Sequence, residues 1–346
     1  MAETDIAELS ARDLAAVVPD PIVIVDAGGA VVHANRAAID AFGTMPAGTR
    51  LPLRFRAPEM RQMLDGVLRT GRADAIDYAE RVPIERAFRV MATPVGGRPG
   101  LFAVMFKDQS EARRIDRMRA DFIANASHEL RTPLASVAGF IETLRGPARD
   151  DEKAREAFLA IMQAQTARMA RLIDDLLSLS RIETRPYSRP KEKIDIGEIV
   201  AGVVAAQDHV ARESGVTIAF ERPERPVLAP GNRDELIQVF ENLLENARKY
   251  GQSGGRVDIT IVETETGPAP EVAVTVRDYG PGIAAEHIPR VTERFYRIDV
   301  ETSRAQQGTG LGLSIVKHIL TRHDGRLTIR SAPGEGAAFT VHLPAQ

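Results

Sequence analysis

The sequence predicts an α+β multidomain protein made of a small α/β module, an antiparallel helical hairpin and an α/β sandwich. Three observations predict this fold class. Residues 1–110 mix short alternating strands with short helical runs, residues 111–185 keep apolar side chains at helical spacing, and residues 194–346 alternate helices with strands. The length of 346 residues fits two or three domains of ordinary size.

Composition narrows the class of protein. With 44% apolar and 27% charged residues, the chain has an ordinary globular composition and enough material for real cores. A net charge of −3 gives no excess of positive charge that could bind nucleic acid, so no direct nucleic-acid partner is expected. The lack of cysteine excludes disulfides, thiolate metal sites and cysteine nucleophiles.

The hydropathy pattern bears on location. No apolar run reaches the about 18 residues of a membrane span, and no signal peptide precedes residue 10. We therefore expect a cytoplasmic protein, either soluble or the cytosolic part of something larger. In the second case it would lie at the inner membrane through a missing segment or a membrane partner.

Residues 1–110 read as one small sensor-like module. A short helix is expected over 1–16, strands over 22–26 and 30–35, and later strands over 86–92 and 101–106. The last strand leads directly into a charged helix, without a linker rich in Gly or Ser. A rotation or tilt of this module can therefore pass to the next one.

Residues 111–185 predict two long antiparallel helices. Ile123, Leu130, Val137 and Leu144 recur every seven positions, and Gly146-Pro147 ends the first helix. A second helix over 152–184 carries an apolar stripe of its own. Two helices cannot bury two such stripes, so we expect a homodimeric four-helix bundle. The simpler interpretation is a dimerisation stalk with no chemistry.

The first helix holds the stretch D-F-I-A-N-A-S-H-E-L-R-T-P-L, residues 121–134. His128 lies beside the apolar seam, next to Glu129, and Thr132 follows on the same side of the helix. An imidazole next to a carboxylate that can take its second ring proton can act as a nucleophile. The alternative is a solvated surface histidine. Pro133 is expected to kink or loosen the helix just after His128.

Residues 186–193, rich in Pro, Arg and Lys, are expected to be a hinge before the domain at 194–346. That domain is expected to be a mixed sheet with helices on one side. One of its helices carries N-L-L-E-N-A-R-K-Y, which places Asn242, Asn246 and Lys249 along one face. Amide oxygens suit a Mg²⁺ ion that substrate phosphates also hold, Lys249 offers a charge for phosphate, and Tyr250 offers an aromatic wall. Alone, these are ordinary solvated helix residues.

Two glycine motifs follow. In D-Y-G-P-G-I, residues 278–283, Asp278 can accept the exocyclic amine of adenine, while Gly280 and Gly282 let the backbone approach the purine. An ordinary turn is the alternative. In G-T-G-L-G-L, residues 308–313, three glycines lead into a helix whose first N–H groups form an anion site.

The segment between the glycine motifs, residues 284–307, is charged and lacks apolar periodicity, as is typical of a lid. Within its motif E-R-F-Y-R, Phe295 would pin the lid and Arg297 can reach a terminal phosphate, where phosphoryl transfer needs positive charge.

The five motifs in this order resemble the H, N, G1, F and G2 boxes of bacterial sensor histidine kinases, over residues 106–345. The third part resembles the Bergerat ATP-binding fold shared with gyrase B, Hsp90 and MutL. The run P-D-P-I-V-I-V-D-A-G-G-A-V-V-H-A-N resembles a PAS domain. The detail F-I-A-N-A-S-H-E-L-R-T-P-L-A-S-V-A-G-F-I-E-T-L is most similar to the phosphate-regulon sensor kinases of the PhoR type.

The resemblance implies a role for each matching position. His128 would be the phospho-acceptor and Glu129 its general base, and Thr132 would position water to dephosphorylate a partner response regulator. Asn246 would bind Mg²⁺, with Asn242 as a second amide near the metal. The residues implied in ATP binding are Asn242, Asn246, Lys249, Tyr250, Asp278, Gly280, Gly282, Arg297, Gly308, Thr309, Gly310, Leu311 and Gly312.

The resulting hypothesis is a sensor histidine kinase that phosphorylates His128 from ATP and passes the phosphoryl group to a response-regulator aspartate. One alternative is a dimeric scaffold that only binds nucleotide. Another is a gyrase-type ATPase. Such ATPases carry a Glu where this chain has Asn242, and Glu241 is expected to point elsewhere, about 100° around the helix. His318 and His323 are expected at the surface, at the end of a helix.

Overall fold

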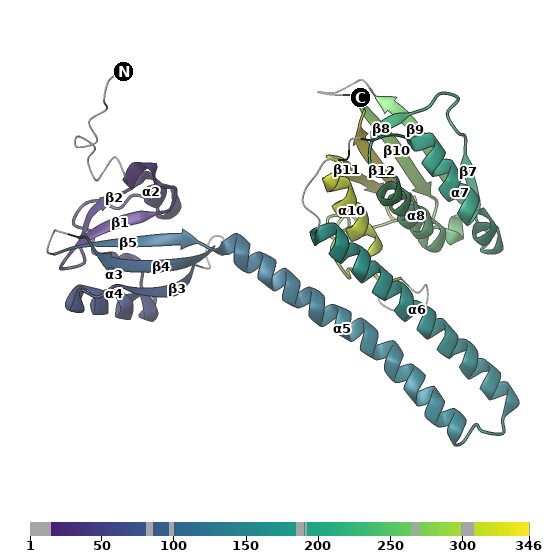
Figure 1. Cartoon of the computed structure of the whole chain (residues 1–346), viewed down its shortest axis with the longest axis horizontal. Coiled ribbons are helices and arrows are strands. Elements are labelled where there is room, and N and C mark those ends of the chain that lie inside the picture. The colour runs from purple at the N-terminus through teal and green to yellow at the C-terminus, as the bar shows by residue number, and fades with distance from the viewer. Residues whose placement is uncertain are drawn as a thin grey trace. The chain divides into compact units, whose positions relative to one another are not determined.

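The computed structural model describes residues 15–80, 86–96, 100–184, 190, 192–264, 270–298 and 308–345. The chain forms two compact units, Met1–Ile123 and Ala124–Gln346 (Figure 1). The expected helix over 1–16, the hinge over 186–193 and the lid over 284–307 lie partly outside the described residues.

The first unit is a five-stranded antiparallel sheet with helices, in the strand order β2-β1-β5-β4-β3. The expected opening hairpin and both later strands are confirmed. Its elements are β1 Ile22–Asp26, β2 Val31–Ala34, α2 Arg36–Phe42, α3 Leu51–Arg54, α4 Pro58–Thr70, β3 Asp74–Glu80, β4 Arg86–Pro94 and β5 Leu101–Asp108.

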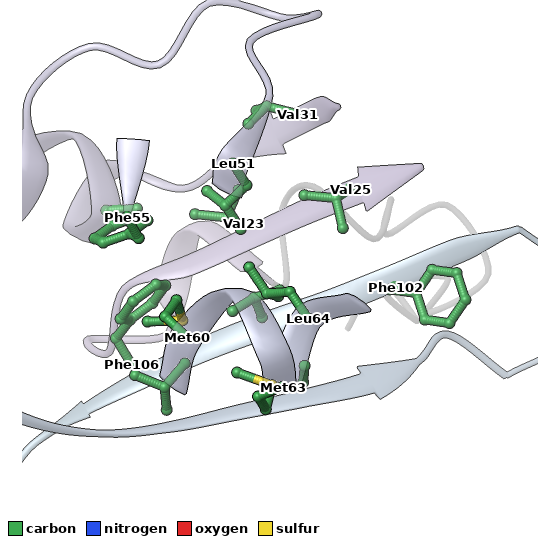
Figure 2. Packing of buried hydrophobic residues seen from close by; sticks show 14 of the residues in the cluster. Val23, Val25, Val31, Leu51, Phe55, Met60, Met63, Leu64, Phe102 and Phe106 are labelled. Atoms are coloured by element: carbon green, nitrogen blue, oxygen red, sulfur yellow. The ribbon is translucent and has the colours of Figure 1, made fainter. Parts of the chain in front are cut away.

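The core of this unit lies between the sheet and α4 (Figure 2). Strand side chains alternate between buried and partly exposed, and α4 contributes Met60, Met63 and Leu64. Aromatic rings fill the centre: the ring of Phe42 lies 5.1 Å from that of Phe55 and 4.8 Å from that of Phe106.

Asn35 is the main polar group of this core. Its Oδ1 accepts hydrogen bonds from the N–H groups of Ile22 and Ala38, both at 2.9 Å. One oxygen therefore binds the start of β1 and also caps the N-terminus of α2. Its Nδ2 donates to the carbonyls of Ala15 and Asp20, at 3.0 and 2.9 Å. The side chain therefore joins three segments: β1, α2 and the stretch before β1.

The helical hairpin consists of α5, Ser110–Arg145, and α6, Glu152–Thr184, close to the expected bounds. The helix α5 continues through Pro133, which is buried. Asp151 accepts a hydrogen bond from the Ala154 N–H at 2.9 Å and so caps α6. Near the turn, the rings of Phe140 and Phe158 stack at 4.9 Å.

The rest of the second unit is an α/β sandwich around a five-stranded sheet in the order β11-β12-β10-β9-β7, with a two-stranded sheet of β6 and β8. Among the described strands of the larger sheet, β7 and β9 pair in parallel and the other pairs are antiparallel, so the sheet is mixed, as expected. Helices α7, α8 and α10 lie on one side of it (Figure 1). The elements are β6 Lys193–Asp195, α7 Ile196–Glu213, β7 Thr217–Phe220, β8 Leu228–Pro230, α8 Arg233–Tyr250, η2 Gln252–Gly254, β9 Arg256–Thr264, β10 Glu271–Asp278, α10 Gly312–Arg322, β11 Arg326–Ser331 and β12 Ala337–Pro344.

We predict that Asn35→Ala lowers the unfolding free energy of the first unit by about 2 kcal/mol, because two buried N–H groups lose their acceptor. Hydrogen exchange of the β1 and α2 amides measures this, and their protection should fall about thirtyfold. Asp40→Ala, which removes only an exposed ion pair with Arg36, is the control and should change protection little. Equal protection in both variants would contradict the role given to Asn35.

Candidate active site

The polar face of α8, which carries Asn242, Asn246 and Lys249, forms one wall of a cleft. The Asn232 side chain caps this helix by accepting a hydrogen bond from the Glu235 N–H at 3.1 Å. One face of α8 buries Leu236, Leu243 and other apolar residues, which fixes the helix rotation. Because of that rotation Asn242, Asn246, Lys249 and Tyr250 all line the cleft, as their spacing predicts.

The cleft has a volume of about 270 Å³. Four segments line it: α8, α6 of the hairpin, the segment of Val291 and Tyr296, and the glycine loop with the start of α10. The lining residues are Arg171, Asp174, Asp175, Gln238, Glu241, Asn242, Glu245, Asn246, Lys249, Tyr250, Val291, Tyr296, Gly308, Thr309, Gly310, Gly312 and Leu313. The contribution of α6 was not predicted, because no local pattern reveals which helix packs across the site.

The two asparagines offer oxygens to a ligand. Asn242 donates through Nδ2 to the Gln238 carbonyl at 2.9 Å, and its Oδ1 lies against Gly312, where a Cβ atom would be 2.8 Å away. Within the described ranges the Asn246 side chain has no hydrogen-bond partner. Amide oxygens next to a phosphate site fit a magnesium ion, which usually takes few ligands from the protein itself.

The cleft is acidic. Its lining holds four carboxylates, those of Asp174, Asp175, Glu241 and Glu245, against the cations Arg171 and Lys249. Lys249 pairs with Glu245 at 2.5 Å. The expectation that Glu241 points elsewhere was wrong: a stripe that faces a groove is at least about 100° wide, so the neighbouring position also lines the cleft. Burial and the nearby Glu245 raise the pKa of Glu241.

Asp278 lies at the end of β10, outside the lining of this cleft. It is only 5% exposed, and burial raises its pKa, while the N–H groups of Gly280, 2.9 Å, and Ala337, 3.3 Å, stabilise the carboxylate. Gly280 packs against the backbone of Tyr250, which connects this turn to the cleft. Gly282 has φ +74°, and a Cβ there would lie 1.9 Å from the Ala332 carbonyl oxygen, so only glycine fits.

The glycine loop and the E-R-F-Y-R segment support each other. The Phe295 N–H donates to the Gly310 carbonyl at 2.8 Å, and a Cβ on Gly310, φ +74°, would lie 2.9 Å from the Phe295 Cα. Phe295 itself has φ 61°, which is rare for an aromatic residue. The helix α10 begins without a side-chain cap, so its first N–H groups suit an anion. Tyr296, which the sequence did not single out, also lines the cleft.

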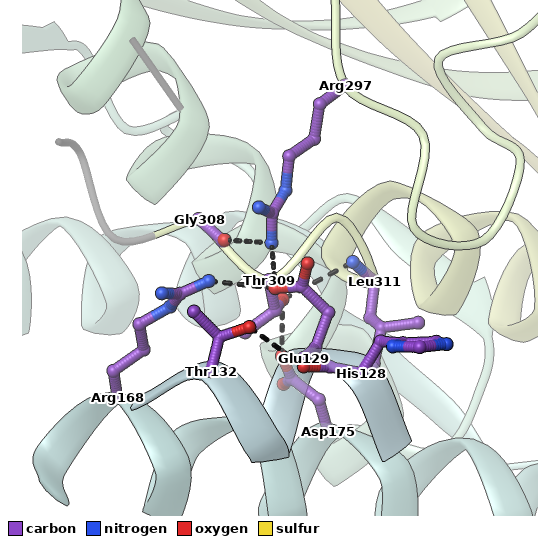
Figure 3. A network of polar contacts seen from close by, with 9 residues as sticks. All are labelled: His128, Glu129, Thr132, Arg168, Asp175, Arg297, Gly308, Thr309 and Leu311. Carbon is purple, nitrogen blue, oxygen red and sulfur yellow. Dashed lines mark hydrogen bonds and ion pairs between the residues drawn. The ribbon is translucent and has the colours of Figure 1, made fainter. Parts of the chain in front are cut away.

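Glu129 connects the hairpin to this loop (Figure 3). Its Oε2 accepts hydrogen bonds from Arg168 of α6 at 2.8 Å and from Arg297 at 3.0 Å. Arg297 also donates to the Gly308 carbonyl at 2.6 Å, and its side chain is 6% exposed. The structure thus places Arg297 between Glu129 and the glycine loop, behind the cleft lining.

A second polar contact joins α6 to the loop. Thr309 donates its hydroxyl hydrogen to Asp175 Oδ2 at 2.7 Å and accepts a hydrogen bond from the Leu311 N–H at 3.3 Å (Figure 3). Burial raises the pKa of Asp175, and the Thr309 hydrogen bond partly opposes that shift. Thr309 and Leu311, both expected at the phosphate side, are therefore held in place by a hairpin carboxylate.

His128 and Thr132 lie on the exposed surface of α5. The Thr132 hydroxyl donates to the His128 carbonyl at 3.2 Å. In the part of the chain that the structure describes, the His128 imidazole has no hydrogen-bond partner, so both ring nitrogens are open to a reactant.

His323 differs from the expectation, because it is buried at the end of α10 and not at the surface. Its Nδ1 lies 2.8 Å from the Ile319 carbonyl and its Nε2 accepts from the Asn232 N–H at 3.0 Å, which requires the neutral ring with hydrogen on Nδ1. Burial lowers the pKa of His323. The strand-to-helix turn before α8 covers this ring, a contact that helix periodicity does not reveal.

Comparison with protein families agrees with this geometry. Residues 231–346 match the histidine kinase-, DNA gyrase B- and HSP90-like ATPases, residues 118–185 match the His kinase A (phospho-acceptor) domain, and residues 12–74 match a PAS domain. Fold and site thus define an ATP-binding kinase with a phospho-acceptor hairpin. The chain belongs to the sensor histidine kinases of two-component systems.

Two curated relatives illustrate the similarity. The chain is 34% identical to the phosphate regulon sensor protein PhoR of Pseudomonas aeruginosa, over 97% of this chain and 74% of that protein. It is 31% identical to the sensor protein kinase WalK of Staphylococcus epidermidis, over 94% of this chain, and spans about half of that protein, 53%.

Among solved structures, the histidine kinase ThkA, crystallised in complex with the response regulator protein TrrA, shares the fold. The TM-score is 0.54 at 19% identity, covering 98% of this chain and 99% of that one. Across the described residues, no helix is both long and apolar enough to cross a membrane.

We predict that Gly282→Ala weakens binding of a fluorescent ATP analogue more than about tenfold, because its Cβ meets a backbone oxygen and forces the turn to move. Gly334→Ala is the matched control: its φ is +83°, yet a Cβ there meets nothing within 4 Å. The Gly334→Ala variant has the same backbone strain but no collision, so its affinity for the ATP analogue should stay within about threefold of the wild-type value. Equal losses in the two variants would contradict this reasoning.

We predict that the unfolding free energy falls between pH 7 and pH 5 in part through His323. Its folded pKa lies below the ordinary value of about 6.5, so below that pH the unfolded chain binds more protons and gains stability relative to the folded chain. Urea unfolding at several pH values measures the slope. In His323→Gln the slope should be shallower, and an unchanged slope would refute the assignment.

Proposed function

We propose that this kinase phosphorylates His128 from ATP and then passes the phosphoryl group to an aspartate of a response regulator. One observation carries the proposal. The hairpin exposes His128 on α5, and its other helix, α6, lines the cleft together with Asn242, Asn246 and the glycine loop. A phospho-acceptor and a nucleotide site that share one structural element can be brought together by a modest movement of the ATP-binding domain.

Within the ATP site, Asp278 accepts the adenine amine and Tyr250 flanks the base. Lys249 and the N–H groups from Gly308 to Gly312 bind phosphate oxygens. Arg297 is the second phosphate ligand, and to take that role it exchanges Glu129 for a phosphate oxygen, which is an equally suitable anionic partner for a guanidinium.

Asn246 would hold Mg²⁺, with Asn242 as a second amide beside it. The residues fit this ion, because both asparagines line the cleft and the acidic lining disfavours a nucleotide without a countercharge. When bound, Mg²⁺ neutralises charge on the phosphate groups.

In the reaction, a ring nitrogen of His128 bonds to the γ-phosphorus while the bond from that phosphorus to the β–γ bridging oxygen breaks, and ADP leaves. Glu129 takes the proton from the other ring nitrogen. Lys249 and Arg297 stabilise the charge that spreads over the transferring group. In the second step a regulator carboxylate replaces the histidine at phosphorus.

The active protein is proposed to be a homodimer through the hairpin. Apolar side chains on both helices remain exposed in the single chain, including Ile123 at 65% and Leu134 at 59%. A contiguous apolar stripe of this kind is stable in water only when another helix pair covers it. We propose the domain organisation 1–110 for the PAS-like sensor, 111–185 for the hairpin, 186–193 for the hinge and 194–346 for the ATP-binding domain.

The partner is proposed to be a response regulator of the phosphate-regulon type, supported by the similarity to PhoR of Pseudomonas aeruginosa. Thr132, one helical turn after His128 and exposed, would position water to dephosphorylate that regulator. The kinase draws on cytoplasmic ATP and the regulator takes the phosphoryl group from His128, so a cytoplasmic location is proposed for both.

Incubation with γ-labelled ATP and Mg²⁺ tests the proposal. We expect an acid-labile, alkali-stable label that disappears in His128→Ala and falls more than about a hundredfold in Asn246→Ala. His209→Ala, which removes an exposed histidine of α7, is the control and should label normally.

The same experiment separates the alternatives. Nucleotide binding without label would favour the scaffold. Steady phosphate release that survives His128→Ala would favour the gyrase-type ATPase, with Glu241 as the carboxylate that activates water, since it does line the cleft.

A further inference from the structure

The ion pair between Arg168 and Glu129 lies wholly within the hairpin. The two residues are 39 positions apart, and the antiparallel packing of α5 and α6 brings Nη2 and Oε2 to 2.8 Å. The Arg168 side chain is only 11% exposed, which is low for an arginine on a two-helix hairpin. A charge-assisted bond in a partly desolvated position holds its carboxylate more firmly than a surface pair does.

Both guanidinium groups at this site bind the same carboxylate oxygen. Arg168 and Arg297 donate to Oε2 of Glu129, and within the described residues Oε1 accepts no hydrogen bond. One oxygen is therefore fixed by arginine while the other stays open. An open oxygen on a fixed carboxylate is what a base needs to accept a proton from a neighbouring ring.

The two arginines differ in where they belong. Arg297 is part of the ATP-binding domain and moves with it. Arg168 is part of the hairpin that carries His128, so its bond to Glu129 does not depend on where the ATP-binding domain lies. During phosphoryl transfer, when Arg297 binds phosphate, Arg168 remains as the group that holds Glu129.

We propose that Arg168 is a positioning residue for histidine phosphorylation: it holds Oε2 of Glu129 and thereby directs Oε1 to the proton of His128. This inference rests on the proposed role of Glu129 as the base. Arg168 does not line the cleft, and it acts through Glu129: a carboxylate already held in one rotamer loses less conformational freedom when it accepts the proton.

The test measures autophosphorylation from γ-labelled ATP and Mg²⁺ in the full chain, with Arg168→Gln, Arg168→Lys, Glu129→Gln and the double variant Arg168→Gln/Glu129→Gln. We expect Arg168→Gln to lower kcat about tenfold and to leave KM for ATP within about twofold. Arg168→Lys should recover part of the rate, because it restores the charge without the guanidinium geometry. The double variant should be no slower than Glu129→Gln alone.

Arg155→Gln on the same helix, whose partner Glu152 is exposed, is the matched control and should leave kcat unchanged. Melting temperature and ATP-analogue affinity are measured for every variant, and if Arg168→Gln melts early the comparison is made with Arg168→Lys.

The outcomes distinguish the two hypotheses. If Glu129→Gln slows labelling but Arg168→Gln does not, the positioning role of Arg168 is wrong, while the role of Glu129 as the base stands. If the two effects multiply in the double variant, Arg168 acts independently of Glu129 and the inference fails. If Glu129→Gln labels at the wild-type rate, the base assignment itself fails, and with it this inference.

Discussion

The packing of α6 against the ATP-binding domain is the contact on which the geometry of the site depends. Leu179 and Ile182 are buried there, and the polar pairs Ser178–Gln238 and Glu183–Arg294 lie around them. The apolar pair supplies most of the attraction, since ion pairs at an exposed rim contribute little. With α6 in this place, one helix serves as half of the phospho-acceptor hairpin and as a wall of the nucleotide cleft.

This double use of α6 couples charge in the two parts of the protein. Asp174 and Asp175 add negative charge to a cleft that binds ATP, and the lining cations Arg171 and Lys249 offset that charge in part. In the other direction, Arg297 of the ATP-binding domain forms an ion pair with Glu129 of the hairpin. Under the proposed role of Arg297 as a phosphate ligand, nucleotide binding and docking on the hairpin draw on the same group, so each changes the free energy of the other.

Features set by local sequence could be predicted, and features set by distant packing could not. The helices and strands, the stripe of Asn242, Asn246 and Lys249, and the glycine turns follow from spacing within a few residues. The wall formed by α6 and the burial of His323 arise between segments more than 50 residues apart in sequence. Glu241 differs from the expectation for another reason: the cleft is wide enough that two helix neighbours about 100° apart both line it.

Pro133 gives the long helix α5 a mechanical property. Proline has no N–H, so the carbonyl of Glu129, four residues earlier, lacks its helical donor, and the preceding carbonyl is shared with the hydroxyl of Thr132. One turn of a 36-residue helix is thereby more compliant than the rest. A bend of α5 therefore costs least at that turn, which contains the backbone of His128.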